Sequence, residues 1–344
     1  MNERRYTMMV RRWLAAFAWL FMTCFFCSAS SAQTEELADE LKEYPYKLVY
    51  ETYRESNWEL FIVDADGSNP VNLTRTPDVN EIYPKVSPDG TKIAFLVDEG
   101  QGVSLVRSAY WMNLDGTGRK LIGKHIRWLC WSPDGTRVAY LKEKPGEFDY
   151  RDDTSKGLVL YDPTTAKHEE HPNKDLHHIY NVGWSPDGNW FVATVHAGMG
   201  YRHTNLAIEA RGTKVFDLGF GGCRPDISPD GKRVAWGASD WTIRAADLDL
   251  TGSEPKITNS RDVVNSPKPN MVYHTDWSPD GKYIAFSRGA RTKRLGISPA
   301  YVGIQGEGWN ICVADPTQEN RWVAITTDGK SNKEPEWVRQ RVAP

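Results

Sequence analysis

The sequence predicts an all-β protein, a six-bladed β-propeller of four-stranded antiparallel blades. Its main support is the tetrapeptide Ser-Pro-Asp-Gly, which occurs five times, with starts 45, 53, 43 and 50 residues apart. A repeat of about 40 to 50 residues is typical of propeller blades when its contents are strands. The second observation is that the two ends of the repeat region complement each other. The five copies begin at Ser87, Ser132, Ser185, Ser228 and Ser278.

Each tetrapeptide has the composition of a tight hairpin turn. Pro presets φ at the first central position, Asp bonds nearby backbone, and Gly takes a positive φ without a Cβ clash. An apolar residue precedes each copy and a β-rich run follows it, such as residues 92–96 or 282–286. The recurring Asp is therefore interpreted as a turn residue and not as part of a set of catalytic carboxylates.

The ends of the repeat region raise the number of blades from five to six. Residues 46–74 contain the later strands of a blade with no preceding turn, whereas residues 334–338 resemble the strand that precedes the turn. If Trp337 takes the place of Trp277, the C-terminal strand closes the blade that the N-terminal strands begin. Closure of this kind removes exposed sheet edges. We expect the propeller to span residues 46–344, preceded by a lead segment at residues 33–45.

Residues 1–32 have the pattern of a cleaved signal peptide. Four Arg residues precede an uncharged, mostly apolar run from Trp13 to Cys27, which is too short to span a bilayer, and small residues end at Ala32. We expect cleavage after Ala32 and a periplasmic or secreted protein without a transmembrane span. Arg11-Arg12 leaves twin-Arg export open beside Sec export, and lipidation at Cys24 or Cys27 or an uncleaved interfacial anchor are the alternatives.

The charge and cysteine content narrow the class of protein. Removal of residues 1–32 leaves 38 basic and 44 acidic groups, which gives an acidic chain without the Lys/Arg excess that nucleic-acid binding needs. The three remaining cysteines, Cys130, Cys223 and Cys312, have no close spacing. They predict neither a disulfide framework nor a CxxC metal site.

The repeat resembles that of the TolB family of six-bladed propellers. Residues Trp131–Tyr140 and Trp277–Phe286 match its WSPDG-x-x-(I/V)-A-(F/Y) unit, and Asp64–Thr74 matches its D-A-D-G-S-N…L-T hairpin. The resemblance covers about Tyr46 to Val342 and implies the propeller fold, but we expect the N-terminal α/β domain of that family to be lacking. Similar repeats occur in scaffold proteins, in prolyl-peptidase-like enzymes and, more distantly, in oligogalacturonate lyase-like enzymes, so the resemblance does not settle function.

Loop lengths predict which face of the propeller binds a ligand. The turns from first to second and from third to fourth strand lie on one face, and long insertions at 142–156, 196–205, 258–273 and 287–309 fall on the other. These insertions and the segments beside them concentrate basic, aromatic and His side chains, which suggests an anionic or hydroxyl-rich ligand; solvated loop residues without a partner are the alternative. The candidate ligand-binding residues are His178, His196, Tyr201, Arg202, His203, His274, Arg288, Arg291, Arg294 and Gln305.

A second set of candidates is predicted to face the central channel. Asp226, Asp276 and Glu336 each stand two residues before the Ser of a turn or its C-terminal equivalent, and Lys85 has the same position. Three carboxylates and one Lys would either bind a cation or form a hydrated network of ion pairs.

Two functions of different classes follow from these candidates. The first is a non-catalytic binding or scaffold propeller that engages an envelope protein or an anionic oligosaccharide through its long-loop face. The second, implied by the lyase resemblance, is a metal-dependent lyase acting on uronates. It would use a divalent cation such as Ca²⁺ or Mn²⁺ held by His196, His203 and His274, with His203, His274 and Arg202 as catalytic candidates. The sequence contains no G-x-S-x-G elbow and no P-loop. The lyase resemblance implies closely spaced His and Gln ligands in a late blade, whereas here Gln305 has no neighbouring His, so we favour the binding function.

Overall fold

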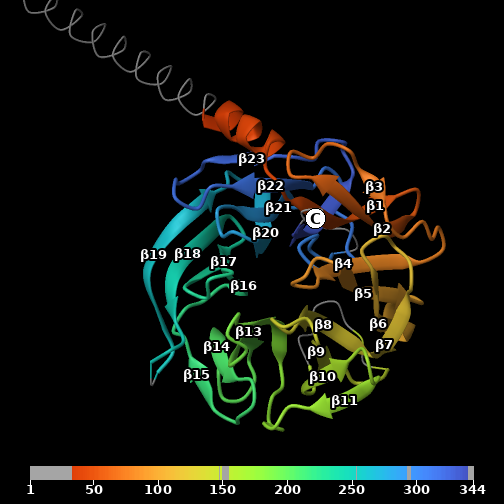
Figure 1. The fold of residues 1–344 in the computed structure, drawn as a ribbon, viewed down its shortest axis with the longest axis vertical. Coiled ribbons are helices and arrows are strands. Elements are labelled where there is room, and N and C mark those ends of the chain that lie inside the picture. Colours follow the sequence, from red (N-terminus) through yellow and green to blue (C-terminus); the bar gives the residue numbers. More distant parts are fainter. Residues whose placement is uncertain (1–32, 147, 149–154, 253, 293–295, 340–344) are drawn as a thin grey trace, which may run out of the picture.

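The computed structural model describes residues 33–146, 148, 155–252, 254–292 and 296–339. These residues form six four-stranded antiparallel sheets, arranged as blades around a central axis (Figure 1). The predicted all-β six-bladed propeller is therefore confirmed. The predicted signal peptide at residues 1–32 lies outside the described residues.

The blades follow one another along the chain, and within each blade the strands are ordered from innermost to outermost. Blade 1 contains β24 (Ser331–Val338), β1 (Lys47–Arg54), β2 (Asn57–Asp64) and β3 (Val71–Asn72); blade 2 contains β4 (Asn80–Val86), β5 (Lys92–Glu99), β6 (Val106–Asn113) and β7 (Lys120–Lys124). Blade 3 contains β8 (Ile126–Trp131), β9 (Val138–Lys142), β10 (Leu158–Asp162) and β11 (Lys167–Glu170); blade 4 contains β12 (Ile179–Trp184), β13 (Trp190–His196), β14 (His203–Glu209) and β15 (Val215–Asp217). Blade 5 contains β16 (Cys223–Ile227), β17 (Arg233–Ser239), β18 (Thr242–Asp249) and β19 (Lys256–Asn265); blade 6 contains β20 (Asn270–Trp277), β21 (Ile284–Ala290), β22 (Asn310–Ala314) and β23 (Trp322–Ala324). A 3₁₀ turn, η1 (Gly102–Ser104), lies between β5 and β6.

The Ser-Pro-Asp-Gly segments form the predicted turns between the first and second strands. In blade 3, for example, Gly135 N donates to Ser132 O at 2.8 Å, and Ser132 Oγ donates to the Asp134 carboxylate at 2.5 Å. We call the face that carries these turns the turn face, and the opposite face, which carries the connections from second to third strands, the long-loop face. The Asp side chains are held within their own turns, in agreement with their interpretation as turn residues.

The C-terminal strand closes the ring as predicted. β24 pairs antiparallel with β1, with Leu48 opposite Trp337, so blade 1 is made from both ends of the described chain. Small side chains in the second strands let neighbouring blades approach closely. The seventh residue after the turn Ser is a fully buried Ala in four repeats: Ala94, Ala139, Ala235 and Ala285.

The predicted loop at 258–273 is largely wrong. Residues 256–265 form β19, which pairs along β18 as the outer edge of blade 5, and β20 begins at Asn270. Most residues of β19 are exposed at the edge of the sheet, and sequence patterning does not separate a polar edge strand from a polar loop. His274, expected before the innermost strand of blade 6, lies inside β20.

A short helix at residues 33–42 packs on the rim of blades 6 and 1 (Figure 1). Its Leu37 and Leu41 are fully buried in a cluster with Tyr283 and Trp337. Glu40 accepts a hydrogen bond from Tyr283 Oη and another from Arg321 Nη2, the latter at 2.7 Å. The lead segment is therefore anchored to the propeller by both apolar burial and charge.

Candidate functional site

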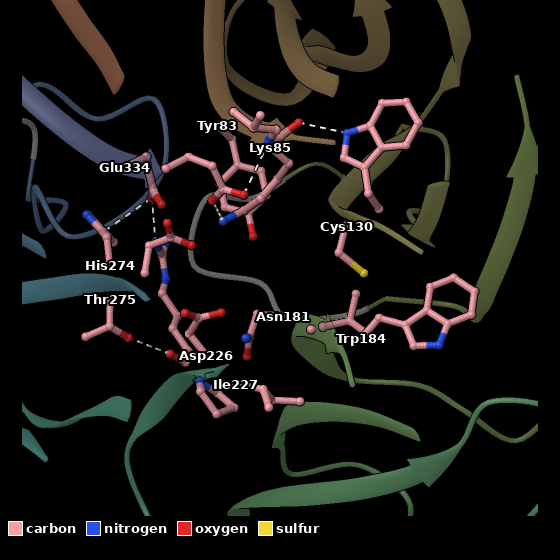
Figure 2. A pocket seen from close by; sticks show the side chains of 18 of the residues that line it. Tyr83, Lys85, Cys130, Asn181, Trp184, Asp226, Ile227, His274, Thr275 and Glu334 are labelled. Carbon is pink, nitrogen blue, oxygen red and sulfur yellow. Dashed lines mark hydrogen bonds and ion pairs between the residues drawn. The ribbon is translucent and has the colours of Figure 1, made fainter. Parts of the chain in front are cut away.

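The innermost strands surround a cavity of about 180 Å³ at the centre of the propeller (Figure 2). Its walls come from two levels of the innermost strands. Residues two before the turn Ser form what we call the turn-side ring: Lys85, Cys130, Gly183, Asp226, Asp276 and Glu336. Residues four before it form the loop-side ring: Tyr83, Asn181, Arg224, His274 and Glu334.

The carboxylates of the turn-side ring join neighbouring blades. Asp226 Oδ2 accepts a hydrogen bond from Trp277 N at 2.7 Å, and Asp276 Oδ2 accepts one from Trp337 N at 2.7 Å. Glu336 Oε1 continues the pattern with Val86 N at 3.3 Å, while its Oε2 pairs with Lys85 Nζ at 2.6 Å. The three predicted channel carboxylates and Lys85 thus line one cavity.

The negative charge of this ring is only partly compensated. Burial raises the pKa of Asp226 to about 7. Burial, followed by repulsion from Glu336 and Asp226, raises the pKa of Asp276 well above its ordinary value. Burial opposes the charged form of Lys85, but the neighbouring Glu336, Tyr83 and Asp276 together outweigh it, so the pKa of Lys85 lies well above its ordinary value. An additional cationic group in the cavity would therefore stabilise carboxylates that the single Lys does not satisfy.

The loop-side ring is built from strained backbone. Tyr83, Arg224, His274 and Glu334 have positive φ values of 54°, 57°, 63° and 51°, and each lies where the innermost strand has a β-bulge. Side chains with a Cβ adopt this conformation rarely. The bulges turn these large side chains toward the axis, where they meet one another.

These side chains form a buried, internally paired cluster. Arg224 Nη1 is hydrogen-bonded to Glu334 Oε1, and the guanidinium lies 4.8 Å from the ring centroid of Trp128. His274 accepts from Ser287 Oγ at Nδ1 and donates to Ala300 O at Nε2. Burial, then the nearby Arg224 and Lys333 charges, hold the pKa of His274 well below its ordinary value, so its imidazole is neutral.

Residues 298–304, which we call the channel loop, close the cavity at the long-loop face. Lys333 Nζ donates to Pro299 O at 3.1 Å and to Tyr301 O at 2.9 Å. Arg224 Nη2 lies 3.4 Å from Ala300 O, the same carbonyl that His274 contacts at 3.0 Å. Three side chains from three different innermost strands therefore hold consecutive carbonyls of this loop.

The cavity opens at the turn face. Side-chain exposure is 21% for Lys85 and 13% for Glu336, but 7% for Arg224 and 1% for His274. Pro88, which also lines the cavity, is exposed at the turn of blade 2. A ligand would thus approach the turn-side ring, whereas the loop-side ring supports the channel from behind.

The predicted loop residues are distributed over several sites. His196 and His203 lie opposite each other in β13 and β14 with ring centroids 4.1 Å apart, and Arg202 and Tyr201 precede His203 in the same connection. His178 Nδ1 donates to Ala197 O at 3.1 Å, which places it at the same edge of blade 4.

The remaining candidates lie elsewhere. Arg288 donates to Ser266 Oγ, Arg291 pairs with Asp240 at 3.0 Å, and Gln305 lines a separate cavity of about 320 Å³. Arg294 lies outside the described residues.

The structure does not bring together the three His residues proposed for a metal. His274 is buried in the channel with Arg224 and Glu334, whereas His196 and His203 lie at the edge of blade 4. Among the described residues, no group of three or more His, Cys, Asp or Glu side chains is placed to hold a metal ion. No helix in the described part of the chain is long and apolar enough to cross a membrane.

Sequence reasoning missed most of the loop-side ring and the buried pair behind it. Glu51 and Lys333 are both fully buried with Oε1 and Nζ 3.4 Å apart, and burial raises the pKa of Glu51 to about 7. One signal was available: Arg224 and Glu334 are charged residues at the same repeat position, each two residues before a predicted channel carboxylate.

Comparison with known proteins supports the fold. No protein-family model matches the chain. The chain is 29% identical over 277 residues to dipeptidyl-peptidase 5 of Porphyromonas gingivalis, a match that covers 66% of this chain and 40% of that protein. It is 24% identical over 220 residues to an uncharacterised protein of Agrobacterium fabrum, covering 59% of this chain and 68% of that one. The first match therefore leaves more than half of the peptidase uncovered.

Among solved structures, TolB from Acinetobacter baumannii superimposes with a TM-score of 0.61 at 18% identity, covering 86% of this chain and 67% of TolB. The gluconolactonase PpgL of Pseudomonas aeruginosa superimposes with a TM-score of 0.51 at 13% identity, covering 85% of this chain and 99% of PpgL. Oligogalacturonate lyase in complex with manganese superimposes with a TM-score of 0.44 at 13% identity, covering 70% of this chain and 82% of the lyase. The TolB-like propeller fold is confirmed, and because TolB and a protein named as a gluconolactonase share it, the fold alone does not decide the function.

Proposed function

We propose that this protein is a non-catalytic binding module of the cell envelope, which holds a protein partner at the turn-face opening of the central channel. The observation that carries the proposal is the turn-side ring, where Asp226, Asp276 and Glu336 face a single Lys85. Burial is the main cause of the raised pKa values of Asp226 and Asp276, so a cationic group of a partner would favour the charged form of both carboxyl groups. Export to the envelope rests on the predicted signal peptide at residues 1–32.

The chemistry of the opening favours a basic group of the partner, such as a Lys or Arg side chain. A cation placed among the three carboxylates gains from a low-dielectric site and needs little reorganisation, because backbone N–H groups already fix the carboxylates. An anionic oligosaccharide would be repelled there. On the long-loop face, Arg291 is paired with Asp240 and Arg288 is bonded to Ser266. The positive charge of these two Arg side chains is therefore less available to an anionic ligand than we expected from the sequence.

The lyase alternative is less well supported by the geometry. It needs His196, His203 and His274 at one metal ion, with a basic residue beside the uronate carboxylate. His274 instead donates to the channel loop and contacts Glu334, and its side chain is almost fully buried. We therefore put forward the binding function alone.

The test combines site-specific crosslinking with isosteric variants. A photo-crosslinking amino acid at position 88, on the rim of the opening, should capture an envelope protein in cells, and the same group at exposed position 145 on the long-loop face should not. The double variant Asp226→Asn, Asp276→Asn keeps an oxygen for each blade-to-blade hydrogen bond but removes the charge. It should abolish the crosslink, and the purified double variant should bind a Lys-containing peptide of the captured protein at least tenfold more weakly.

Crosslinking at position 145 instead, or full capture by the double variant, would contradict this placement of the site. Asp262→Asn serves as the matched control, because Asp262 is paired with Arg244 on the outer strand of blade 5, outside the channel. Its binding should equal that of the unaltered protein.

A further inference from the structure

We propose that the seam between blades 3 and 4 on the turn face is a second binding site, which takes a neutral oligosaccharide. A groove of about 790 Å³ follows this seam, a volume within the range of small-ligand sites. Trp184 forms part of its wall, together with Pro133, Pro172 and Pro186. This site goes beyond the proposed function and does not depend on it, because it uses none of the channel carboxylates.

The groove is open because Arg137 of blade 3 does not cover the Trp of the next blade, as Arg233 of blade 5 does. In the seam between blades 5 and 6, the guanidinium of Arg233 lies 4.5 Å from the ring centroid of Trp277 and donates to Gly281 O at 3.0 Å. Arg137 holds the same repeat position in blade 3, five residues after the turn Ser. Its Nη1 instead pairs with Glu169 Oε2 at 2.8 Å.

The strand register explains the difference. Glu169 in β11 is opposite Leu160, which is opposite Ala139 in β9. The same position in blade 5 is Arg261, opposite Ala245 and, through it, Ala235. A carboxylate in the outer strand attracts Arg137 outward. In blade 5 this position offers no carboxylate to Arg233, because it is occupied by Arg261, which donates to Pro316 O. Trp184, the counterpart of Trp277, therefore lines an open groove.

The ring of Trp184 is held in a fixed position, so that one of its faces can contact a ligand. Its Nε1 donates to Gly188 O at 3.2 Å, and its ring packs against Phe191 with centroids 4.5 Å apart. Figure 2 shows the indole of Trp184 extending away from the channel carboxylates. A half-buried indole with its N–H satisfied offers a rigid apolar surface at low entropic cost, which suits the C–H face of a sugar ring.

The polar groups of the groove favour a neutral ligand with many hydroxyls. Arg137 and Glu169 neutralise each other, and Glu170 is paired with Lys142 at 2.6 Å and with Lys174 at 3.1 Å. The other charged residues of the wall are Arg211 and two turn residues, Asp134 and Asp187, each of which accepts a hydrogen bond from the Ser of its own turn. Paired groups still offer hydrogen-bond donors and acceptors in fixed directions but provide little net charge to attract an ion. Hydroxyl groups, which both donate and accept, match this arrangement.

An added peptide strand fits the groove less well. β11 is the outer edge of blade 3 and supplies Glu169 and Glu170 to the wall. It has four residues, all exposed, and three of them are Lys or Glu. Short, charged edge strands of this kind resist pairing with another chain.

The experiment uses three neutral hexasaccharides, of glucose, of mannose and of N-acetylglucosamine, with hexagalacturonate as the acidic comparison. Binding to the purified protein is measured by calorimetry and by Trp fluorescence. We expect at least one neutral hexasaccharide to bind more tightly than hexagalacturonate. Trp184→Ala should raise its Kd at least tenfold, whereas Trp241→Ala, which removes a half-buried Trp of blade 5, should leave the Kd unchanged.

A second variant tests the groove without altering Trp184. Glu169→Arg reproduces the charge found in blade 5, so Arg137 should move over Trp184, close the groove and raise the Kd at least tenfold. Adding Arg137→Ala to Glu169→Arg should reopen the groove and recover part of the binding, because Trp184 is uncovered again although the polar groups of Arg137 and Glu169 are lost. A merely structural effect of Glu169 would give no recovery. The proposal is overturned if no neutral hexasaccharide binds, if hexagalacturonate binds more tightly, or if Trp184→Ala and Glu169→Arg both bind like the unaltered protein.

Discussion

The buried Arg224–Glu334 pair gives the sharpest test of how the channel is stabilised. The variant Glu334→Gln keeps the shape of the side chain but removes its charge. In the unaltered cluster, Arg224 and Lys333 face Glu334 and Glu51, with His274 neutral. The variant therefore leaves two buried cations against one carboxylate.

Removing one partner of a buried ion pair typically costs about 3 to 5 kcal/mol. The lower end of this range is expected for this pair, because Glu334 contributes to the raised pKa of Glu51, and its removal lets Glu51 ionise more fully. We expect the free energy of unfolding, measured by urea denaturation with Trp fluorescence, to fall by about 3 kcal/mol.

The double variant Arg224→Met, Glu334→Gln separates the pair from the strained backbone. Replacing both charges by neutral groups of similar size should recover most of the loss and bring stability to within about 1 kcal/mol of the unaltered protein. A loss below about 1 kcal/mol for Glu334→Gln alone, or a double variant no more stable than the single one, would refute the reasoning.

Three further perturbations have defined outcomes. Trp337→Ala should lower the free energy of unfolding by about 3 to 5 kcal/mol in urea denaturation, because this buried side chain belongs to the strand that closes the ring; a loss below about 1 kcal/mol would argue against closure as a main source of stability. The pKa of Asp226 is raised to about 7, above its unfolded value near 3.8, so its contribution to stability is lost as pH rises through that interval. Asp226→Asn should therefore gain stability relative to the unaltered protein as pH rises from about 4 to about 7, and a pH-independent difference would contradict the assignment. Gly67→Ala would place a Cβ 1.8 Å from Ile325 O and should lower the melting temperature far more than Gly329→Ala, which has a similar positive φ but open space; equal effects would show that φ alone decides.

Much of the fold could be predicted from the sequence because its determinants are local and repeated. Each Ser-Pro-Asp-Gly turn is stabilised by hydrogen bonds between residues close in sequence, and its five copies mark the positions of the hairpins. The pairing of Leu48 with Trp337 could also be predicted, because each end of the repeat region lacks what the other supplies. The same counting put Lys85, Asp226 and Glu336 at one level of the innermost strands, since equivalent repeat positions must share a radius and a height.

The candidate sites depended on contacts that no repeat encodes. Bulges with positive φ turn Arg224, His274 and Glu334 into the channel, and a bulge shifts a strand by one residue without a distinctive sequence pattern. His274 consequently belongs to the buried channel cluster, and among the described residues it does not join two other possible ligands in a group that could hold a metal ion. The channel loop closes one end of the cavity through carbonyl oxygens, which every residue type possesses.

The sequence by itself determined the all-β class, the six blades, their turns and the closure of the ring, because each follows from short-range backbone preferences repeated along the chain. Only the tertiary structure decided which end of the channel is open and that the seam beside Trp184 leaves a groove. Both depend on which charged side chain a neighbouring strand offers to Arg137, Arg224 or Lys333. Such choices are made between residues distant in sequence, where Coulomb attraction and desolvation in the folded protein decide the outcome.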